Sequence, residues 1–269
     1  MNASWLYHQN PLFIILTLLL AMTTAAEVGF RLGRRWHARS GEAGWTHFRS
    51  ILGSLLGLLA LLLSFTFAMS ANRFDSRRQL VLADANALET LYLQSDLLPD
   101  ASRKAFKQSL RQYVDLRSQI ALLRHDATPA EAAALSDKSD AIHAQMWKAV
   151  KEAAQANPPA TIADEMLKGL AASLSIHRNR MFAWESRVPD SVIWLLLFGC
   201  VAGITAIGLA GGLGNHRGLP ARIIVTFLLC ATIFVVLDLD RPHEGLISVS
   251  QSPILHLQKI LDRDTETNP

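Results

Sequence analysis

The sequence predicts an all-α membrane protein with four transmembrane helices and a helical extramembrane domain between helices 2 and 3. Three observations favour this fold class. Half of the 269 residues are hydrophobic and the mean hydropathy is +0.21, both of which are high for a soluble protein. Four apolar stretches each approach the ~20 residues that a helix needs to cross the hydrocarbon core. The segment between the second and third stretches is polar, and its apolar residues recur at helical spacing.

These observations divide the chain into four parts. Residues 1–71 hold transmembrane helices 1 and 2 with a basic loop, and residues 72–190 form the extramembrane domain. Residues 191–239 hold transmembrane helices 3 and 4, and residues 240–269 form a polar C-terminal tail. We expect the apolar spans themselves at residues 11–30, 51–71, 191–213 and 222–237.

The first span has the features of either a membrane anchor or a cleaved signal peptide. The small residues of TTAAE, residues 23–27, are typical of a cleavage site. However, residues 1–11 contain no Lys or Arg, whereas a signal peptide begins with a positively charged region. We therefore expect an uncleaved anchor. Glu27 would be costly if it faced lipid, so we expect it to pair with Arg31, one helical turn further on.

The second span has a stripe of small residues along one side. Their spacings of four, three, four, four and three average one helical turn, which places them on one face. Such a face either lets another helix pack closely or lines a narrow pore, and the residues alone leave both interpretations open. The stripe consists of Gly53, Gly57, Ala60, Ser64, Ala68 and Ala71.

Charged residues follow this span directly. No Gly or Pro lies between Asn72 and Leu98, so we expect one helix from about Ser50 to Leu98. The four charged residues either form a collar against lipid headgroups or a pore mouth whose positive charge concentrates anions. The acid among them would weaken the second effect. They are Arg73, Asp75, Arg77 and Arg78.

The extramembrane domain reads as helices separated by proline signals. Pro99 and Asp100 start a helix that continues to about Arg124. The next helix starts with the cap residue Thr128 and Pro129, and it ends before residues 157–159 (NPP). The last helix begins near residue 161 and ends at residues 188–189 (VP).

The third span contains two GxxxG pairs, Gly199–Gly203 and Gly208–Gly212, which are typical of close helix packing. The two cysteines, at positions 200 and 230, lie inside the third and fourth spans, so we expect no disulfide.

A junctional cluster of Asp238, Asp240 and Arg241 follows the fourth span, and a proline turn comes next. We expect the cluster to form ion pairs with arginines of the polar domain. Asp238, Asp240 and Glu244 are too few and too loosely spaced to predict a cation site. The sequence has no HExxH motif and no nucleophile motif, and its net charge of +3 comes without any nucleic-acid-binding motif. We therefore expect no enzyme activity, metal, cofactor or nucleic-acid partner.

The distribution of arginines predicts the membrane orientation. The loop at residues 31–50 carries five arginines and one acid, and the loop at residues 214–221 carries Arg217. The positive-inside rule places both loops in the cytoplasm and the extramembrane domain on the non-cytoplasmic side. We expect the protein in a bacterial inner membrane.

Three segments resemble a bacterial bestrophin-like membrane protein family: residues 64–99 (SFTFAMSANRFDSRRQLVLADANALETLYLQSDLLP), 113–117 (YVDLR), and 238–253 (DLDRP followed by GLISVSQSP). The chain is more distantly similar to bestrophins, which are pentameric anion channels whose second membrane helix lines the pore. The resemblance implies a homo-oligomer that conducts small anions along the small-residue face.

The chain departs from bestrophins in two places. Phe65 and Phe67 lie off the small-residue face, whereas bestrophins narrow their pore with aromatic and branched residues. The tail has no dense acidic run, so calcium gating is not implied. Bestrophins also keep their bulk in the cytoplasm, which is opposite to the orientation that the arginines predict. The alternative function is a non-conducting scaffold or sensor that couples the helical domain to the bilayer.

Overall fold

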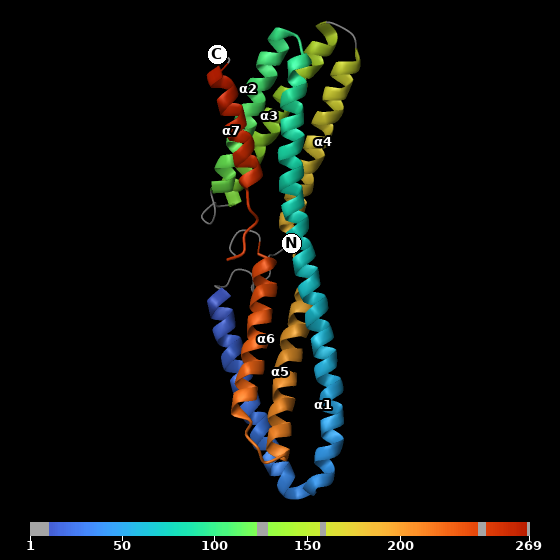
Figure 1. The fold of residues 1–269 in the computed structure, drawn as a ribbon, viewed down its shortest axis with the longest axis vertical. Helices are drawn as coiled ribbons and strands as arrows, with labels where there is room; N and C mark the ends of the chain where they lie inside the picture. Colours follow the sequence, from blue (N-terminus) through green and yellow to red (C-terminus); the bar gives the residue numbers. More distant parts are fainter. Residues whose placement is uncertain (1–10, 123–128, 157–159, 242–245, 268–269) are drawn as a thin grey trace. The chain divides into compact units, whose positions relative to one another are not determined.

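The structure, a computed structural model, describes residues 11–122, 129–156, 160–241 and 246–267 (Figure 1). All regular elements in these ranges are helices, which confirms the all-α prediction. They are α1 (Pro11–Gln94), η2 (Ser95–Leu97), α2 (Asp100–Leu122), α3 (Pro129–Ala156), α4 (Ala160–Glu185), α5 (Asp190–Leu213), α6 (Leu219–Leu239) and α7 (Ser252–Thr267).

Four helical segments among the described residues are long and apolar enough to cross a membrane, as predicted. They are Leu12–Ala38, Ser50–Leu97, Asp190–Leu213 and Leu219–Leu239. The first two belong to α1, which reverses direction between them (Figure 1). The second continues through Asn72 without a break, as the lack of Gly and Pro predicts.

The chain forms two compact units, to which α1 contributes in turn. The membrane unit comprises residues 1–73, 187–241 and 245–247, and the polar unit comprises residues 74–186, 242–244 and 248–269. Both names refer below to the described residues of these ranges.

Glycine pairs bring the backbones of α1 and α5 into close contact inside the membrane unit. A Cβ atom on Gly208 or Gly212 would collide with backbone atoms of α1, and a Cβ on Gly29 or Gly33 would collide with backbone atoms of α5. The predicted packing role of Gly208–Gly212 is therefore confirmed. Its partner pair, Gly29–Gly33, has the same spacing of four and was missed from the sequence.

The other predicted pair, Gly199–Gly203, has a different role in the same unit. A Cβ on Gly203 would lie 2.8 Å from a methyl carbon of Leu59, so the two glycines make room for a side chain of α1. Both cysteines are buried and unbonded to each other, as expected.

Apolar residues at helical spacing fill the core of the polar unit. The α2 residues Phe106, Leu110, Tyr113 and Val114 are fully buried, as their periodicity predicts. Helix α7 adds three more buried residues to this core, at the spacing i, i+3 and i+7. These are Ile254, Leu257 and Leu261. Our expectation of a merely polar tail missed this helix.

Three predicted helix starts agree with the structure, whereas one predicted loop is wrong: residues 31–50, expected as a basic loop after the first span, are helical and belong to α1. Helix α2 begins at Asp100, α3 begins at Pro129, and α5 begins just after Pro189. The expected cap at Thr128, the end near Arg124 and the NPP break at 157–159 lie outside the described residues.

Candidate functional site

The small-residue face of α1 is not covered by any described part of this chain. Gly53, Gly57, Ala60, Ser64 and Ala68 are exposed, and Ala71 is half-buried. A Cβ atom on either glycine of this face would meet no atom within 4 Å. Its place against other subunits, or around a pore, stays a prediction.

A different side of the same span packs inside the chain. Leu59 is 5 % exposed, and its methyl groups fill the space at Gly199 and Gly203 of α5. The Leu59 side therefore packs against α5, while the side with the small residues faces away from the rest of the chain.

The four charged residues after this span have different surroundings. Asp75 is exposed and accepts a hydrogen bond of 2.6 Å from Gln79, and Arg78 is also exposed. Arg73 is half-buried. Arg77 is 2 % exposed. The role of these four as pore-mouth charges stays a prediction.

Arg77 has a clear structural partner in the polar unit. Its Nε donates to the carbonyl oxygen of Ala183 at 3.1 Å, and its Nη2 donates to that of Ser186 at 3.0 Å. These carbonyls lie at the C-terminal end of α4, where a cation is favourable because the helix dipole is negative there. Any contribution of Arg77 to a pore mouth would act at a distance, through its charge.

The acids of the junctional cluster bind backbone amides. Asp238 accepts hydrogen bonds of 2.8 Å from the amides of Leu246 and Ile247, and Asp240 accepts one of 2.9 Å from the amide of Val188. Both acids are fully buried. They therefore fix the chain segments that enter α5 and leave α6.

The remaining predictions for this cluster are not tested. Arg241 is also buried, and the ion pairs that we expect with arginines of the polar domain stay predictions. The proline turn and Glu244 lie outside the described residues. Among the residues that are described, no three His, Cys, Asp or Glu side chains stand close enough to hold a metal ion.

Glu27 gathers basic residues at one end of the membrane unit. Its carboxylate lies 3.1 Å from Arg31, which confirms the predicted pair. Arg217 and Arg222 also approach it, at 3.5 and 3.8 Å. Both of these guanidinium groups lie over the ring of Phe30. Glu27 is therefore neutralised from three sides.

A buried ion cluster in the polar unit was missed from the sequence. Asp84 of α1 is fully buried and accepts a hydrogen bond from Arg180 of α4. Arg117 of α2 lies 3.5 Å from the same carboxylate oxygen. Burial, and then the neighbouring Arg117, lower the pKa of Arg180 to about 10, so Arg180 keeps its charge at neutral pH. One carboxylate thus joins three helices and leaves one positive charge in excess.

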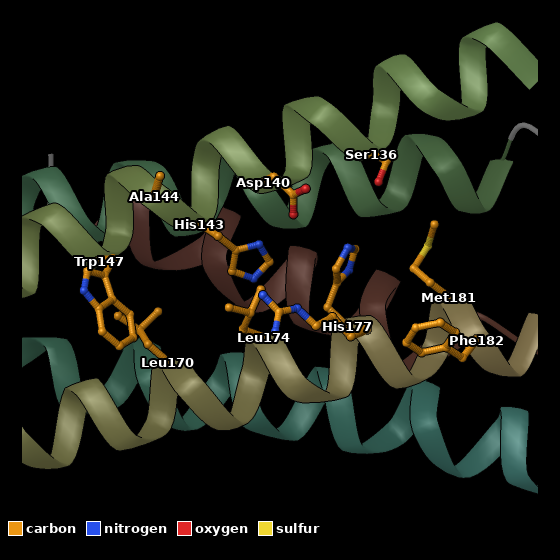
Figure 2. A pocket seen from close by; sticks show the side chains of 11 residues that line it. Ser136, Asp140, His143, Ala144, Trp147, Leu170, Leu174, His177, Met181 and Phe182 are labelled. Carbon is orange, nitrogen blue, oxygen red and sulfur yellow. The ribbon is translucent and has the colours of Figure 1, made fainter.

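A groove of about 700 Å³ lies beside this cluster, between α3 and α4 (Figure 2). Two histidines, one from each helix, stand next to each other in it, with ring centroids 5.5 Å apart. The groove is lined by Ser136, Asp140, His143, Ala144 and Trp147 of α3 and by Leu170, Leu174, His177, Arg178, Met181 and Phe182 of α4.

Each imidazole is held through its Nδ1 atom. Nδ1 of His143 lies 3.0 Å from the carbonyl oxygen of Ser139, and Nδ1 of His177 lies 3.1 Å from the hydroxyl of Tyr113. Burial lowers the pKa of His143. Burial, and then the charge of Arg117, lower the pKa of His177 to about 4. Both rings are therefore neutral at pH 7.

Comparison with known proteins identifies the family. The model of the bestrophin-like domain matches residues 12–254. One similar solved structure is a point variant of a bacterial bestrophin homolog from Klebsiella pneumoniae, with 16% identity and a TM-score of 0.70, covering 94% of this chain and 99% of that chain. Another, of the same homolog phased with zinc, has 16% identity and a TM-score of 0.69, covering 97% and 100%.

At this level of identity the solved structures show a shared fold. No curated protein matches the chain. The family model, however, covers nearly the whole membrane unit and most of the polar unit. The four candidate spans and the continuous second helix agree with that match. The chain therefore belongs to the bestrophin-like family of integral membrane proteins.

Proposed function

We propose that this protein assembles into a ring of identical subunits that conducts small anions, with the small-residue face of α1 lining the pore. One observation carries the proposal: the face of Gly53, Gly57, Ala60, Ser64 and Ala68 is exposed on the subunit. Small side chains leave space at the axis when several helices surround it. The likeness to bestrophins, which are anion channels, supports the same role.

Two aromatic side chains of the span are exposed on the single chain and would be more favourable against lipid or a neighbouring subunit. Phe65 is 64% exposed and Phe67 is 42% exposed, and Phe65 lies on a different side of the helix from Ser64. A ring would place these aromatic side chains against bilayer or subunit surfaces, where they are favourable, and leave the small face toward the axis.

Cysteine labelling tests which side of α1 faces the pore. The native Cys200 and Cys230 are buried, so the protein already offers a low background for thiol reagents. We expect Ser64→Cys, reconstituted in liposomes, to lose anion flux when an anionic methanethiosulfonate is added. Phe65→Cys is the matched control, because it is adjacent and exposed but lies off the face. Equal sensitivity of the two variants would contradict a pore along the small face.

The same liposomes test conduction itself against the rival function of a scaffold or sensor. We expect chloride flux well above that of empty liposomes. Folded, oligomeric protein without flux would favour the scaffold or sensor, for which the unbroken helix from Ser50 onward is the supporting feature.

Two of the charges after the span, the half-buried Arg73 and the exposed Arg78, provide a test of selectivity. Replacing Arg73 and Arg78 with Glu would reverse their contribution to the field at a pore mouth, and we expect chloride permeability to fall relative to that of sodium. Arg35→Glu, in the arginine-rich part of α1 that precedes the second span, is the control. Arg77 is left intact because its buried guanidinium binds backbone carbonyls of the polar unit.

The proposal places the polar unit on the non-cytoplasmic side of a bacterial inner membrane, as the arginine-rich loop favours. Alkaline phosphatase and green fluorescent protein fused after Ser40 and after Asn157 test this orientation. We expect fluorescence at the first site and phosphatase activity at the second. The reverse pattern would place the polar unit in the cytoplasm.

A further inference from the structure

Three arginines meet one carboxylate at the end of the membrane unit where α5 turns into α6 (Figure 1). The Glu27 cluster consists of Glu27, Arg31, Arg217 and Arg222. None of these arginines forms an ion pair with a second acid of the described residues. One negative charge therefore stands against three positive ones, and the cluster keeps two positive charges in excess.

The cluster combines a fixed interior with open cationic groups. The Arg222 side chain is 12% exposed, and its guanidinium lies over the Phe30 ring, 5.8 Å from the ring centroid. The guanidinium of Arg217 lies over the same ring at 5.2 Å. The side chains of Arg31 and Arg217 are 74% and 56% exposed. These two arginines are therefore held in place and remain open to a ligand.

The two open guanidinium groups are close enough to bind one phosphate together. Nε of Arg31 and Nη2 of Arg217 lie 3.1 and 3.5 Å from the same oxygen of Glu27. The separation of these two nitrogens therefore cannot exceed the sum of the two distances. A phosphate group has several acceptor oxygens and matches the planar, forked donors of arginine, so it can bridge two such groups.

The cluster lies at the depth of lipid phosphates. Helix α6 has 21 residues, so at about 1.5 Å per residue it is about 31 Å long, close to the ~30 Å of the hydrocarbon core. Its first residue, Leu219, is therefore near the boundary between acyl chains and headgroups. Arg217 lies just before this boundary in the chain, and Arg222 lies less than one helical turn beyond it.

Apolar side chains adjoin the cluster on both helices. Val28 of α1 is 48% exposed, and Ile223 of α6 is 65% exposed. Acyl chains would cover such surfaces favourably. A phospholipid thus supplies its phosphate at this depth together with an apolar body, whereas a free phosphate ion would have to leave water to reach the same place.

We propose that the Glu27 cluster binds the phosphodiester group of an anionic phospholipid. Arg31 and Arg217 donate hydrogen bonds to the phosphate oxygens, while Glu27 and Phe30 position Arg217. The two excess positive charges favour a lipid with net negative charge over a zwitterionic one. This binding does not depend on whether the protein conducts ions.

Native mass spectrometry of the full-length protein in detergent tests the site with dioleoyl phosphatidylglycerol. We expect one tightly bound lipid per chain. The matched probe is dioleoyl phosphatidylcholine, which has the same acyl chains and phosphodiester but a compensating choline, and we expect it to bind at least about tenfold more weakly. This comparison uses unaltered protein, so it does not depend on how a variant folds. Equal binding of the two lipids would overturn the proposal.

A third probe separates a lipid from a free phosphate. Glycerophosphoglycerol is the phosphatidylglycerol headgroup without its acyl chains, and at equal concentration we expect it not to displace the lipid. Displacement would assign the cluster to soluble phosphodiesters and would contradict a lipid site.

Variants locate the site. We expect the double variant Arg31→Gln, Arg217→Gln to weaken phosphatidylglycerol binding at least about tenfold, because each arginine near an anionic lipid contributes about fivefold. The double variant Arg34→Gln, Arg35→Gln removes the same charge from exposed positions further along α1, and we expect it to bind as the unaltered protein does. Equal losses in the two double variants would indicate a diffuse basic surface and overturn the proposal, as would full binding by the first.

Discussion

The two units of this protein pack their helices by different means. In the membrane unit, Gly208 lies so close to α1 that an added Cβ would strike the backbone of Ala26. In the polar unit, a Cβ on Gly169 would meet only side-chain atoms, the nearest of which is a methyl carbon of Leu91 at 2.8 Å, and a flexible side chain can rotate to relieve this contact. Lipid offers no hydrophobic drive for helix association, so close backbone packing takes its place, whereas the polar unit gains stability by burying large apolar side chains.

The units also treat charge differently. The acid Glu27 of the membrane unit is only partly buried and meets its three arginines at the end of the helices. Asp84 of the polar unit is fully buried with Arg117 and Arg180. A buried ion cluster is stable only when every member is present, because removing one member leaves a buried charge that neither water nor a partner compensates. This contrast predicts where single substitutions are most damaging.

The largest expected effect is at the buried cluster. Asp84→Asn removes the counter-charge of two buried arginines, and we expect it to destabilise the polar unit by about 3–5 kcal/mol. Thermal or denaturant unfolding of the purified protein measures this loss. Asp137→Asn, on the exposed side of α3, should change stability by less than about 0.5 kcal/mol.

A triple replacement separates charge from packing at this cluster. If the loss comes from unpaired charge, replacing Asp84, Arg117 and Arg180 together with Leu, Met and Met should cost less than Asp84→Asn alone. A triple variant as unstable as the single one would show instead that shape, rather than charge balance, decides.

Acid should weaken the polar unit selectively. The folded-state pKa of His177 is about 4, below its ordinary value of 6.5, because burial and Arg117 disfavour the cation. A depressed histidine pKa gives stability that is present above pH 6.5 and is lost as the pH falls toward 4, because the unfolded chain binds the proton first. Three other titratable groups, His143, Asp84 and Asp140, also act on the charge of His177. We expect the free energy of unfolding to fall by about 2–3 kcal/mol between pH 6.5 and 4.

Unfolding curves of the full chain between pH 7 and 4 check this expectation. His177→Gln cannot take up the proton, so its stability should fall less over that range, while the exposed His256→Gln should behave like the unaltered protein. An unchanged slope in His177→Gln would assign the acid sensitivity to other groups.

Most of the helices could be predicted from the sequence, because the residues that start, stop or mark them lie within or next to each helix. Proline starts α3, Pro189 precedes α5, and unbroken runs of apolar residues mark the spans. Helix α7 carried the same kind of signal in Ile254, Leu257 and Leu261, but three apolar residues in a short, charged tail are a weak pattern. Packing against the core of the polar unit, rather than the local sequence, stabilises α7 as a helix.

The site was harder to predict because its parts are brought together from distant segments. Asp84 lies in the apolar series of Val81, Ala85 and Leu88, so a charge on a buried face was visible in advance. Nothing local indicated that Arg117 and Arg180 would be its partners. The histidine pair likewise depends on the alignment of α3 with α4, and His143 and His177 are too far apart in the sequence to form a recognisable motif.

Close backbone packing in the membrane unit gives the next prediction. Gly208→Ala places a methyl group against backbone atoms that have no freedom to rotate, and we expect a loss of about 1–3 kcal/mol. Gly169→Ala, in the middle of α4, should be neutral or slightly stabilising, since Ala favours helix and only the Leu91 side chain has to move. Thermal unfolding in detergent compares the two. Equal losses would remove the distinction between the units.

The smallest expected effect concerns how α7 is held to the polar unit. The Tyr92 hydroxyl donates a hydrogen bond to Asp264 of α7 and accepts one of 3.1 Å from Arg111. Tyr92→Phe removes both and keeps the buried ring, so we expect a loss of about 1 kcal/mol. Hydrogen exchange should show faster opening of α7 amides with α2 amides unchanged, because Ile254, Leu257 and Leu261 still hold the helix to the core. Faster exchange throughout α2 would instead mean that α7 and the core open together, as one cooperative element.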